Sequence, residues 1–233
     1  MFNLKKLLAI AIIVTFLASI PLAVIPKDSG IVQLVFTISA DANYAKPSGN
    51  GNAKPSADYK VIFQNYKAEV PLDLTVYTSN DDELSASFVL DAVSQAAYAW
   101  DDATSKTLVN SVTSSDGSGV VVYNNINALF FADYSNSQVI AVASIWINRF
   151  TKQIVECDIQ FNTDYTWGDA TVNTAIMDLQ NIATHELGHD FNLDDIYDST
   201  KSYLTMYGYS FNGDIEKRTL AAGDIAGIQK IYG

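Results

Sequence analysis

The most apolar part of the chain lies at its N-terminal end. A short positive segment that ends at Lys6 precedes an uncharged apolar stretch, Leu7–Ile25, and a second apolar stretch, Ile31–Ala40, follows. This order is typical of a secretory signal, although a run of about 20 apolar residues is also long enough to stay in a bilayer as an anchor. Ala40-Asp41-Ala42 has the small-x-small form of a cleavage site. We therefore assign residues 1–42 to a signal peptide or membrane anchor and expect the rest of the chain to be exported.

Residues 43–58 are rich in Gly, Pro, Ser and Asn, and they contain the sequence Ala-Lys-Pro-Ser twice. This composition is typical of a flexible linker. The residues that follow, 59–233, alternate apolar runs with polar turns over a length that suits one domain. We therefore expect a single folded domain after the linker.

Strands are predicted on both sides of an early helix. In this helix, apolar residues recur at helical spacing from Val89 to Trp100, and we expect the acidic pair Asp81-Asp82 to lie at its positive end. The spacing favours Trp100 as a core residue. Segments rich in β-branched and apolar residues predict four strands, namely Leu72–Tyr77, Asn127–Phe131, Val139–Ile147 and Ile154–Phe161.

Two more helices are predicted in the last third of the chain. Asp178 is a suitable N-cap for a helix over Leu179–Asp190. A second stripe of apolar residues, from Ala221 to Tyr232, predicts a final helix. One early helix, a group of strands and two late helices together indicate the α+β fold class.

Composition and charge narrow the possible functions. Hydrophobic residues make up 48% of the chain and charged residues 17%, which rules out wholesale disorder. The net charge of −12 makes the chain a poor candidate for binding nucleic acid or an anionic lipid surface, because both require a basic surface. Cys157 is the single cysteine, so an intramolecular disulfide is excluded. Its place on the apolar face of a predicted strand favours a buried, inert thiol.

Both histidines of the chain lie in one segment, His185-Glu186-Leu187-Gly188-His189. Residues at i and i+4 share one face of a helix, so His185 and His189 can direct imidazole nitrogens at one zinc ion. Glu186 lies one step around the helix, where it can reach a water on the metal and act as a general base. This spacing is a known zinc protease signature, and we predict a metal site here rather than a chance match.

A catalytic zinc usually takes a third protein ligand. After His189, Asn192 and Asp195 stand at the glycine and third-ligand positions of the pattern His-Glu-x-x-His-x-x-Gly-x-x-His/Asp, so the chain resembles the metzincin metalloproteases. The spacing favours Asp195 over Asp194 as the ligand. Asparagine is the next most tolerant residue for the left-handed turn that glycine makes in that family, at a cost of about 1 kcal/mol.

Met206, followed directly by Tyr207, is similar to the Met-turn beneath the metal site in the matrixin branch of that family. The resemblance extends from about Glu69 to Gly233. It implies a metzincin-like domain with a twisted five-stranded mixed sheet and three helices, in which Val139–Ile147 is the antiparallel edge strand. A peptide could add to that edge as a further strand and bring its scissile carbonyl to the zinc.

The resemblance also implies an activity, that of a secreted zinc endopeptidase. His185, His189 and Asp195 would bind one catalytic zinc ion. Glu186 would act as the general base, and Met206 would support the site. Proteins or peptides would be the substrates, and contact with a membrane would depend on retention of the N-terminal segment. Structural calcium is a further possibility that the many carboxylates leave open.

Two features of animal matrixins are missing from this sequence. No cysteine stands before the predicted domain, so the latency that a pro-segment cysteine provides by capping the zinc is absent. With His185 and His189 assigned to the catalytic ion, no histidine is left to hold a structural zinc.

Three functions are therefore open for residues 59–233. The first is a catalytic domain of the matrixin type. The second is a catalytically inactive exported module that binds peptides or surfaces, which Asn192 and the acidic third ligand favour but an intact Glu186 argues against. The third is an adhesion or structural domain in which the motif arose by chance.

Overall fold

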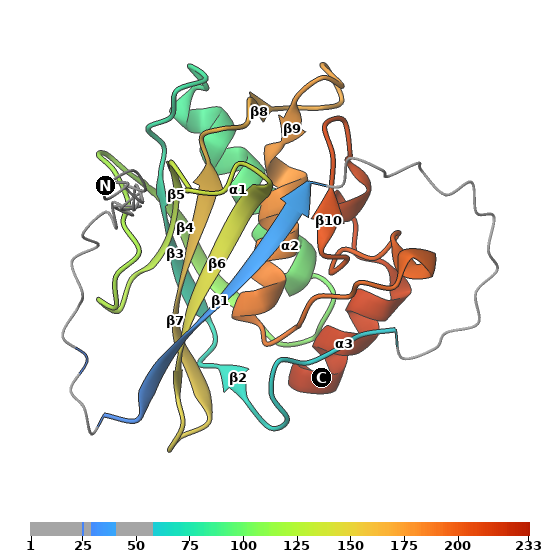
Figure 1. Ribbon diagram of the computed structural model, residues 1–233. Helices are drawn as coiled ribbons and strands as arrows, with labels where there is room; N and C mark the ends of the chain where they lie inside the picture. Colours follow the sequence, from blue (N-terminus) through green and yellow to red (C-terminus); the bar gives the residue numbers. More distant parts are fainter. Residues whose placement is uncertain (1–24, 26–28, 41–57) are drawn as a thin grey trace, which may run out of the picture.

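The computed structural model describes residue 25, residues 29–40 and residues 58–233 (Figure 1). Most of the predicted leader, including nearly all of its first apolar stretch, lies outside the described residues, as does the predicted linker apart from Asp58. No helix within the described ranges is long and apolar enough to cross a membrane.

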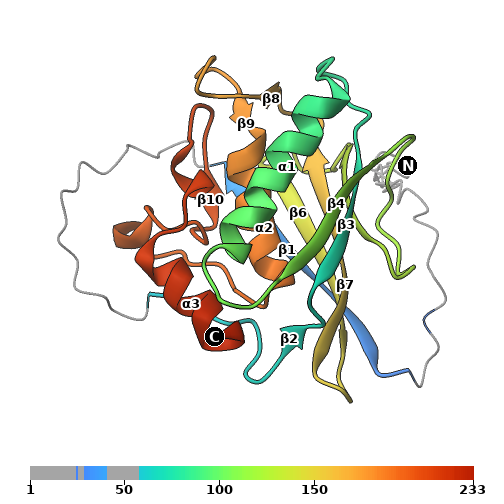
Figure 2. The ribbon, with the colours of Figure 1, turned by 180° about the vertical axis from the view of Figure 1, so that it is seen from behind.

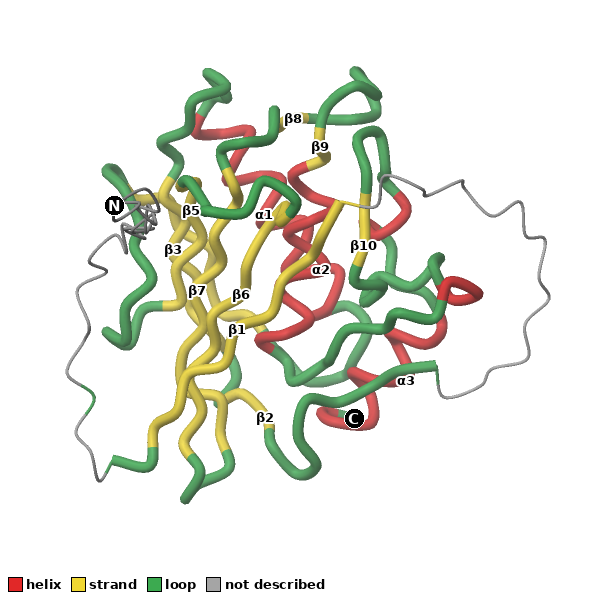
Figure 3. The backbone as a smooth tube through the Cα atoms, in the orientation of Figure 1, coloured by secondary structure: helices red, strands yellow, loops and turns green. Residues whose placement is uncertain are grey.

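A mixed sheet of eight strands forms the centre of the described structure (Figures 1 and 3). Seven strands follow the order β10-β1-β6-β7-β5-β3-β4, and β2 pairs with β7. The strands are β1 (Ile31–Ala40), β2 (Lys67–Ala68), β3 (Leu72–Tyr77), β4 (Val109–Ser115), β5 (Asn127–Ala132), β6 (Val139–Asn148), β7 (Gln153–Asn162) and β10 (Tyr209–Ser210). Two further short strands, β8 (Trp167–Gly168) and β9 (Met177–Asp178), pair with each other.

Five neighbouring strands, β6-β7-β5-β3-β4, match the five-stranded mixed sheet that the family resemblance implies. The last four are parallel to one another, and β6 is antiparallel to β7. The described chain also contains the three helices α1 (Ala86–Asp101), α2 (Leu179–Asp190) and α3 (Ala222–Tyr232), with short 3-10 turns at Ser199–Lys201 and Glu216–Arg218. The α+β fold class is confirmed.

The start of α1 differs from the expectation. Ser85 caps this helix, because its hydroxyl accepts the backbone N–H of Phe88 at 3.2 Å. The first turn contains no acidic residue. Of the acidic pair, Asp82 instead accepts the backbone N–H of Trp167 at 2.9 Å. The predicted role of Asp81-Asp82 at the start of the helix is therefore wrong. The hydroxyl of Ser85 accepts the free N–H of the first turn, and the carboxylate of Asp82 binds a residue far along the chain instead.

The expected edge strand, β6, is not at the edge of the sheet. β1 pairs with it antiparallel along almost its whole length, from Ile31 opposite Asn148 to Ser39 opposite Val139. The sequence places β1 within the predicted leader, where its apolar residues look like a second hydrophobic run. In the structure β1 is a strand with two faces, since Ile38 is fully buried whereas Val35 is 53% exposed. The sheet therefore uses residues from outside 59–233.

Two helices cover one face of the sheet (Figure 2). α2 contacts β6 and β7, and α1 packs against α2. Trp100 of α1 joins the two helices, because its fully buried indole donates its N–H to the carbonyl of Thr184 at 2.8 Å. Trp100 is thus a core residue, as predicted, and α2 is held firmly between α1 and the sheet.

The two faces of β7 are both buried. On the side of α2, Cys157 is a free thiol that is only 2% exposed, and burial raises its pKa well above the usual range. On the other side, Asp158 accepts the backbone N–H of Val122 at 2.9 Å, and Glu156 accepts that of Asn124 at 2.9 Å. The loop before β5 therefore closes over the polar side of β7, and Cys157 is buried as expected.

Candidate metal centre

The beginning of α2 is fixed by its N-cap residue. The carboxylate of Asp178 accepts the backbone N–H of Asn181 at 2.8 Å, as the sequence predicts. Arg218 donates to the same carboxylate at 2.7 Å and so ties the helix to a segment near the C-terminus. From this anchored start, α2 carries His185 and His189 on one buried face, with neither side chain exposed to solvent.

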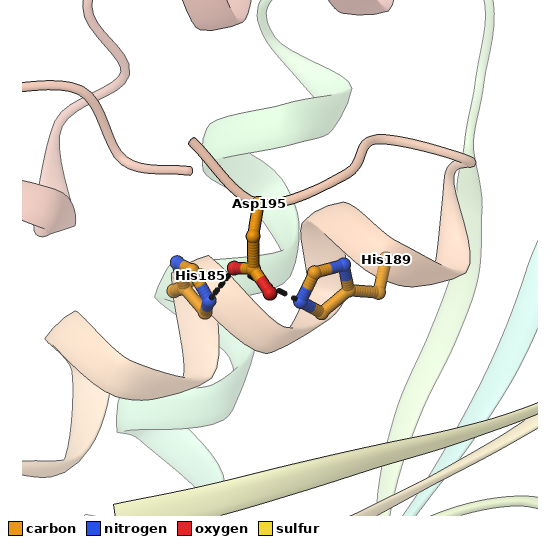
Figure 4. A group of neighbouring side chains, drawn as sticks. All are labelled: His185, His189 and Asp195. Carbon is orange, nitrogen blue, oxygen red and sulfur yellow. Dashed lines mark ion pairs between the residues drawn. The ribbon is translucent and has the colours of Figure 1, made fainter. Parts of the chain in front are cut away.

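Three side chains converge on one point at this face (Figure 4). Nε2 of His185 lies 3.2 Å from Oδ1 of Asp195, and Nε2 of His189 lies 3.8 Å from the same oxygen. One ligand atom from each of the three residues lies within 4.8 Å of the other two. The structure therefore brings together all three residues that the sequence predicts as metal ligands.

The rings are oriented by backbone carbonyls. Nδ1 of His185 lies 2.7 Å from the carbonyl oxygen of Thr205, and Nδ1 of His189 lies 2.9 Å from that of Leu193. Because a carbonyl oxygen only accepts, each Nδ1 carries a proton and each Nε2 presents its lone pair to the cluster. The two Nε2 atoms and Oδ1 of Asp195 are buried and have no hydrogen-bond partner in the described chain. Buried polar atoms without a partner lower the stability of the fold unless a cation binds them. Zinc binds imidazole nitrogens and carboxylate oxygens of this kind.

The charges of the cluster suit a cation. Burial on its own would raise the pKa of Asp195, but the neighbouring imidazoles of His189 and His185 hold it at about 2. Burial lowers the pKa of His189 to about 4. At neutral pH Asp195 is therefore a carboxylate and His189 a neutral imidazole, the forms in which these groups bind a metal.

Asp194 is directed to other partners. Its carboxylate lies 2.5 Å from Nζ of Lys60 and accepts the backbone N–H of Asp195 at 2.9 Å. Tyr197 donates its hydroxyl to Oδ2 of Asp195 at 3.0 Å, which leaves Oδ1 directed at the histidines. These contacts favour Asp195 over Asp194 as the third ligand. Tyr197 was not predicted, because its contact depends on how the loop folds.

The chain reverses direction after α2 at Asn192. This residue has a φ of 72°, the left-handed conformation expected at the glycine position of the motif. Its buried side chain also donates to the carbonyls of Phe63 and Tyr66 at 2.9 and 2.8 Å, and accepts the backbone N–H of Phe63 at 3.1 Å. Asparagine therefore makes the turn and also binds the segment before β2, which glycine could not do.

Met206 packs against the motif helix. A Cβ atom on Gly188 would lie 2.2 Å from Sδ of Met206, so only glycine leaves room for this contact. The carboxylate of Asp224 accepts the backbone N–H groups of Thr205 and Met206 at 2.9 and 3.1 Å. Met206 thus lies where the Met-turn resemblance places it, and Asp224 holds the backbone of that turn.

A buried lysine supports the same turn. Lys217 is 2% exposed, and its Nζ donates to the carbonyls of Leu204, Thr205 and Tyr207 at 3.2, 3.4 and 2.8 Å. The carbonyl of Thr205 also accepts from His185, so Lys217 and this ligand share one acceptor. Burial lowers the pKa of Lys217 to about 8. No sequence pattern predicts this role, because Lys217 stands in a charged triplet typical of a solvated surface.

Glu186 is fully buried beside the cluster. Burial raises the pKa of its carboxyl well above the usual range, and the negative charges of Asp195 and Asp190 add to the rise. A carboxyl group with a raised pKa is a stronger base once ionised, and is therefore better able to take a proton from a water molecule. The arrangement can bind a cation and move a proton next to it.

Comparison with known proteins agrees with this geometry. The family model described as Matrixin matches residues 66–233. Human matrilysin is 36% identical to the chain over 76 residues. That alignment covers 33% of this chain and 27% of the human protein, so the similarity spans about a quarter of the length of that relative.

Replacement of Asn192 tests its double role. We expect Asn192→Gly to lower the free energy of unfolding by about 1–3 kcal/mol, because loss of three buried hydrogen bonds outweighs the relief of about 1 kcal/mol of left-handed strain. Asn192→Ala keeps the strain and should cost more. Urea denaturation measures both effects.

Asn125 offers a matched control, since it is an exposed asparagine with a φ of 65°. Asn125→Gly should leave stability unchanged or raise it slightly. An Asn192→Gly protein as stable as the unmodified one would show that the side-chain contacts contribute nothing.

Zinc affinity distinguishes the two neighbouring aspartates. Asp195→Ala should weaken zinc binding at least about 100-fold, because it removes a ligand rather than a group that orients one. Asp194→Ala should weaken it by about tenfold, the lower end of the effect of a group that orients a ligand, since Asp194 contacts Asp195 only through the backbone N–H. Competition with a chelating dye measures both dissociation constants. Equal losses in the two variants would contradict the assignment of Asp195.

Proposed function

Because the chain belongs to the matrixin family, whose members are metalloproteases, we propose that it is a secreted zinc-dependent endopeptidase. The observation that carries the proposal is the convergence of Nε2 of His185, Nε2 of His189 and Oδ1 of Asp195, all buried and all without another partner in the described chain. Three protein ligands with one remaining position are the usual arrangement of a catalytic zinc.

The three ligands would hold the ion on the face of α2, and bound zinc would supply Lewis-acid chemistry to a water molecule and to the peptide carbonyl. Glu186 would take a proton from the attacking water as the new C–O bond forms. It would then give that proton to the amine nitrogen as the C–N bond breaks, so the carboxylate is regenerated at the end of each cycle. The contact of His189 with the carbonyl of Leu193 and that of Tyr197 with Asp195 would keep these ligands in place throughout the reaction.

Peptides or unfolded proteins are the proposed substrates. An extended peptide can pair with the edge of a sheet through its backbone. β6 contacts the motif helix, and it would offer such an edge only where β1 is not paired with it. Secretion is proposed from the N-terminal pattern of charge and hydrophobicity, together with the extracellular location that matrixins generally have.

The site residues support a catalytic domain over an inactive binding module. Asn192 stands where the family motif has glycine, but it makes the same left-handed turn and adds side-chain contacts. This substitution is therefore not evidence that the site has lost its activity. Glu186 is intact, and its surroundings raise the pKa of its carboxyl. A chance motif would not bring Asp195 to both histidines from a separate loop.

The direct test is the hydrolysis of a denatured protein by the purified chain and by Glu186→Ala. We expect the variant to lose at least about 100-fold in kcat/KM, because a general base typically contributes this much or more. Its zinc content should be unchanged, since Glu186 is not a ligand. Chelation with 1,10-phenanthroline should abolish hydrolysis by the unmodified chain.

Glu69→Ala is a suitable control, because Glu69 is an exposed glutamate that is not one of the metal-binding residues. It should hydrolyse the substrate at the unmodified rate. Full hydrolysis by Glu186→Ala would show that the proposed mechanism is wrong. Zinc binding without hydrolysis in every form of the chain would favour the inactive module.

A further inference from the structure

The carboxylate of Asp195 presents its two oxygens to different groups. Oδ1 lies 3.2 Å from Nε2 of His185 and 3.8 Å from Nε2 of His189, and it has no hydrogen-bond partner in the described chain. In Figure 4 this carboxylate lies between the two imidazole rings. Oδ2 accepts the hydroxyl of Tyr197 at 3.0 Å. One oxygen is therefore left for a metal ion, and a neighbouring side chain binds the other.

Asp195 and Tyr197 lie on the same side of their segment because the residue between them is extended. Ile196 forms a parallel bridge with Tyr207, and its carbonyl accepts the N–H of Gly208 at 3.0 Å. Side chains two residues apart in extended backbone lie on the same face. The bridge therefore places the hydroxyl of Tyr197 beside the third ligand.

The ring of Tyr197 is fixed by two neighbours. A Cβ atom on Gly208 would lie 2.5 Å from Cε1 of this ring, so any larger residue at that position would have to displace the ring. The ring of Tyr209 packs edge-on against it, with centroids 5.5 Å apart and an interplanar angle of 71°. Because packing limits the rotamers of Tyr197, its hydroxyl stays on the buried carboxylate at a small further cost in side-chain entropy.

A carboxylate can bind a metal ion through one oxygen or through both. Chelation by both oxygens of Asp195 would fill a coordination position that a catalytic zinc keeps open for water or substrate. The hydrogen bond from Tyr197 opposes chelation, because Oδ2 would have to leave the hydroxyl to bind the ion. An imidazole as the third ligand would not need such a partner, since a neutral imidazole offers a single lone pair.

We propose that Tyr197 is a positioning residue, which restricts Asp195 to one ligand oxygen and so keeps a coordination position open at the metal centre. The proposal deepens the proposed endopeptidase function and rests on its metal-binding part. It does not depend on hydrolysis, because the number of ligand atoms around a bound ion can be measured without a substrate.

Loss of the Tyr197 hydroxyl distinguishes this role from simple orientation of a ligand. If the hydroxyl only orients Asp195, its loss should weaken metal binding about 10–100-fold. If the hydroxyl prevents chelation, its loss leaves Oδ2 buried without this donor, and a bound ion can satisfy that oxygen instead. The second bond to the ion then offsets the lost orientation. Metal binding is not weakened, but the open position is filled.

The first experiment binds cobalt(II) to the full chain in place of zinc and records the visible absorption spectrum. Its bands are more intense for four-coordinate cobalt than for five-coordinate cobalt. We expect the unmodified chain to give the four-coordinate spectrum, from three protein ligands and one water molecule. Tyr197→Phe keeps the ring and removes the hydroxyl, so its spectrum should lose intensity as Oδ2 becomes a ligand.

Tyr209→Phe is the matched control for this spectrum. It removes a hydroxyl from the ring that packs against Tyr197 and leaves the partner of Asp195 in place. Its spectrum should equal that of the unmodified chain. A four-coordinate spectrum for Tyr197→Phe would overturn the proposal.

The second experiment measures the dissociation constant for zinc by competition with a chelating dye. Tyr197→Phe should bind zinc at least as tightly as the unmodified chain, and Tyr209→Phe should equal it. A loss of about 10–100-fold in Tyr197→Phe would show that the hydroxyl only orients the ligand, and the proposal would then be wrong.

Hydrolysis of a denatured protein separates this proposal from the proposed function. In an active chain, Tyr197→Phe should lower kcat about tenfold or more with little change in KM, because a filled position excludes the reacting water rather than the peptide. An unchanged kcat would contradict the role of Tyr197. If the cobalt and zinc results are as expected but no form of the chain hydrolyses protein, the endopeptidase function fails and the role of Tyr197 stands.

Discussion

The structure depends on the burial of three metal-binding atoms that the protein leaves without partners. Polar atoms away from water cost free energy unless a hydrogen bond or a cation satisfies them. Here the carbonyls of Thr205 and Leu193 accept from the outer nitrogens of His185 and His189, and so direct the inner nitrogens at each other and at Asp195. A divalent ion that binds these atoms removes the free-energy cost of leaving them without partners. Metal binding should therefore stabilise the folded chain.

The supports of the site come from distant parts of the chain. Asn192 turns the backbone behind α2 and bonds to Phe63, 129 positions earlier. Asp224, in the first turn of α3, accepts the backbone N–H groups of Thr205 and Met206. Lys217 donates to a backbone carbonyl of the same Met206 segment. A change in any of these groups would act on the ligands through their orientation. This arrangement explains why the metal centre could not be assembled from α2 alone.

The sequence predicted the parts of this site that local rules determine. The i, i+4 spacing in α2, the Asp178 cap and the left-handed turn at Asn192 are properties of neighbouring residues, so they could be inferred without coordinates. Tyr197 and Lys217 were missed because each depends on a contact formed only in the folded chain. The Ser85 cap is a local signal like that of Asp178, and it was missed because the acidic pair Asp81-Asp82 was taken as the start of the helix. β1 lies within the predicted leader, and a strand with one buried face and a hydrophobic signal look alike in an apolar run. Its pairing with β6 joins segments far apart in the sequence, which no local pattern predicts.

The central claim is that His185, His189 and Asp195 together bind one zinc ion. X-ray absorption at the zinc edge of the purified chain tests it most directly, because the method reports the ligand atoms themselves. The account predicts one zinc per chain with nitrogen and oxygen ligands at about 2.0–2.2 Å and no sulfur. A sulfur ligand at about 2.3 Å, or a protein that binds no zinc, would contradict it.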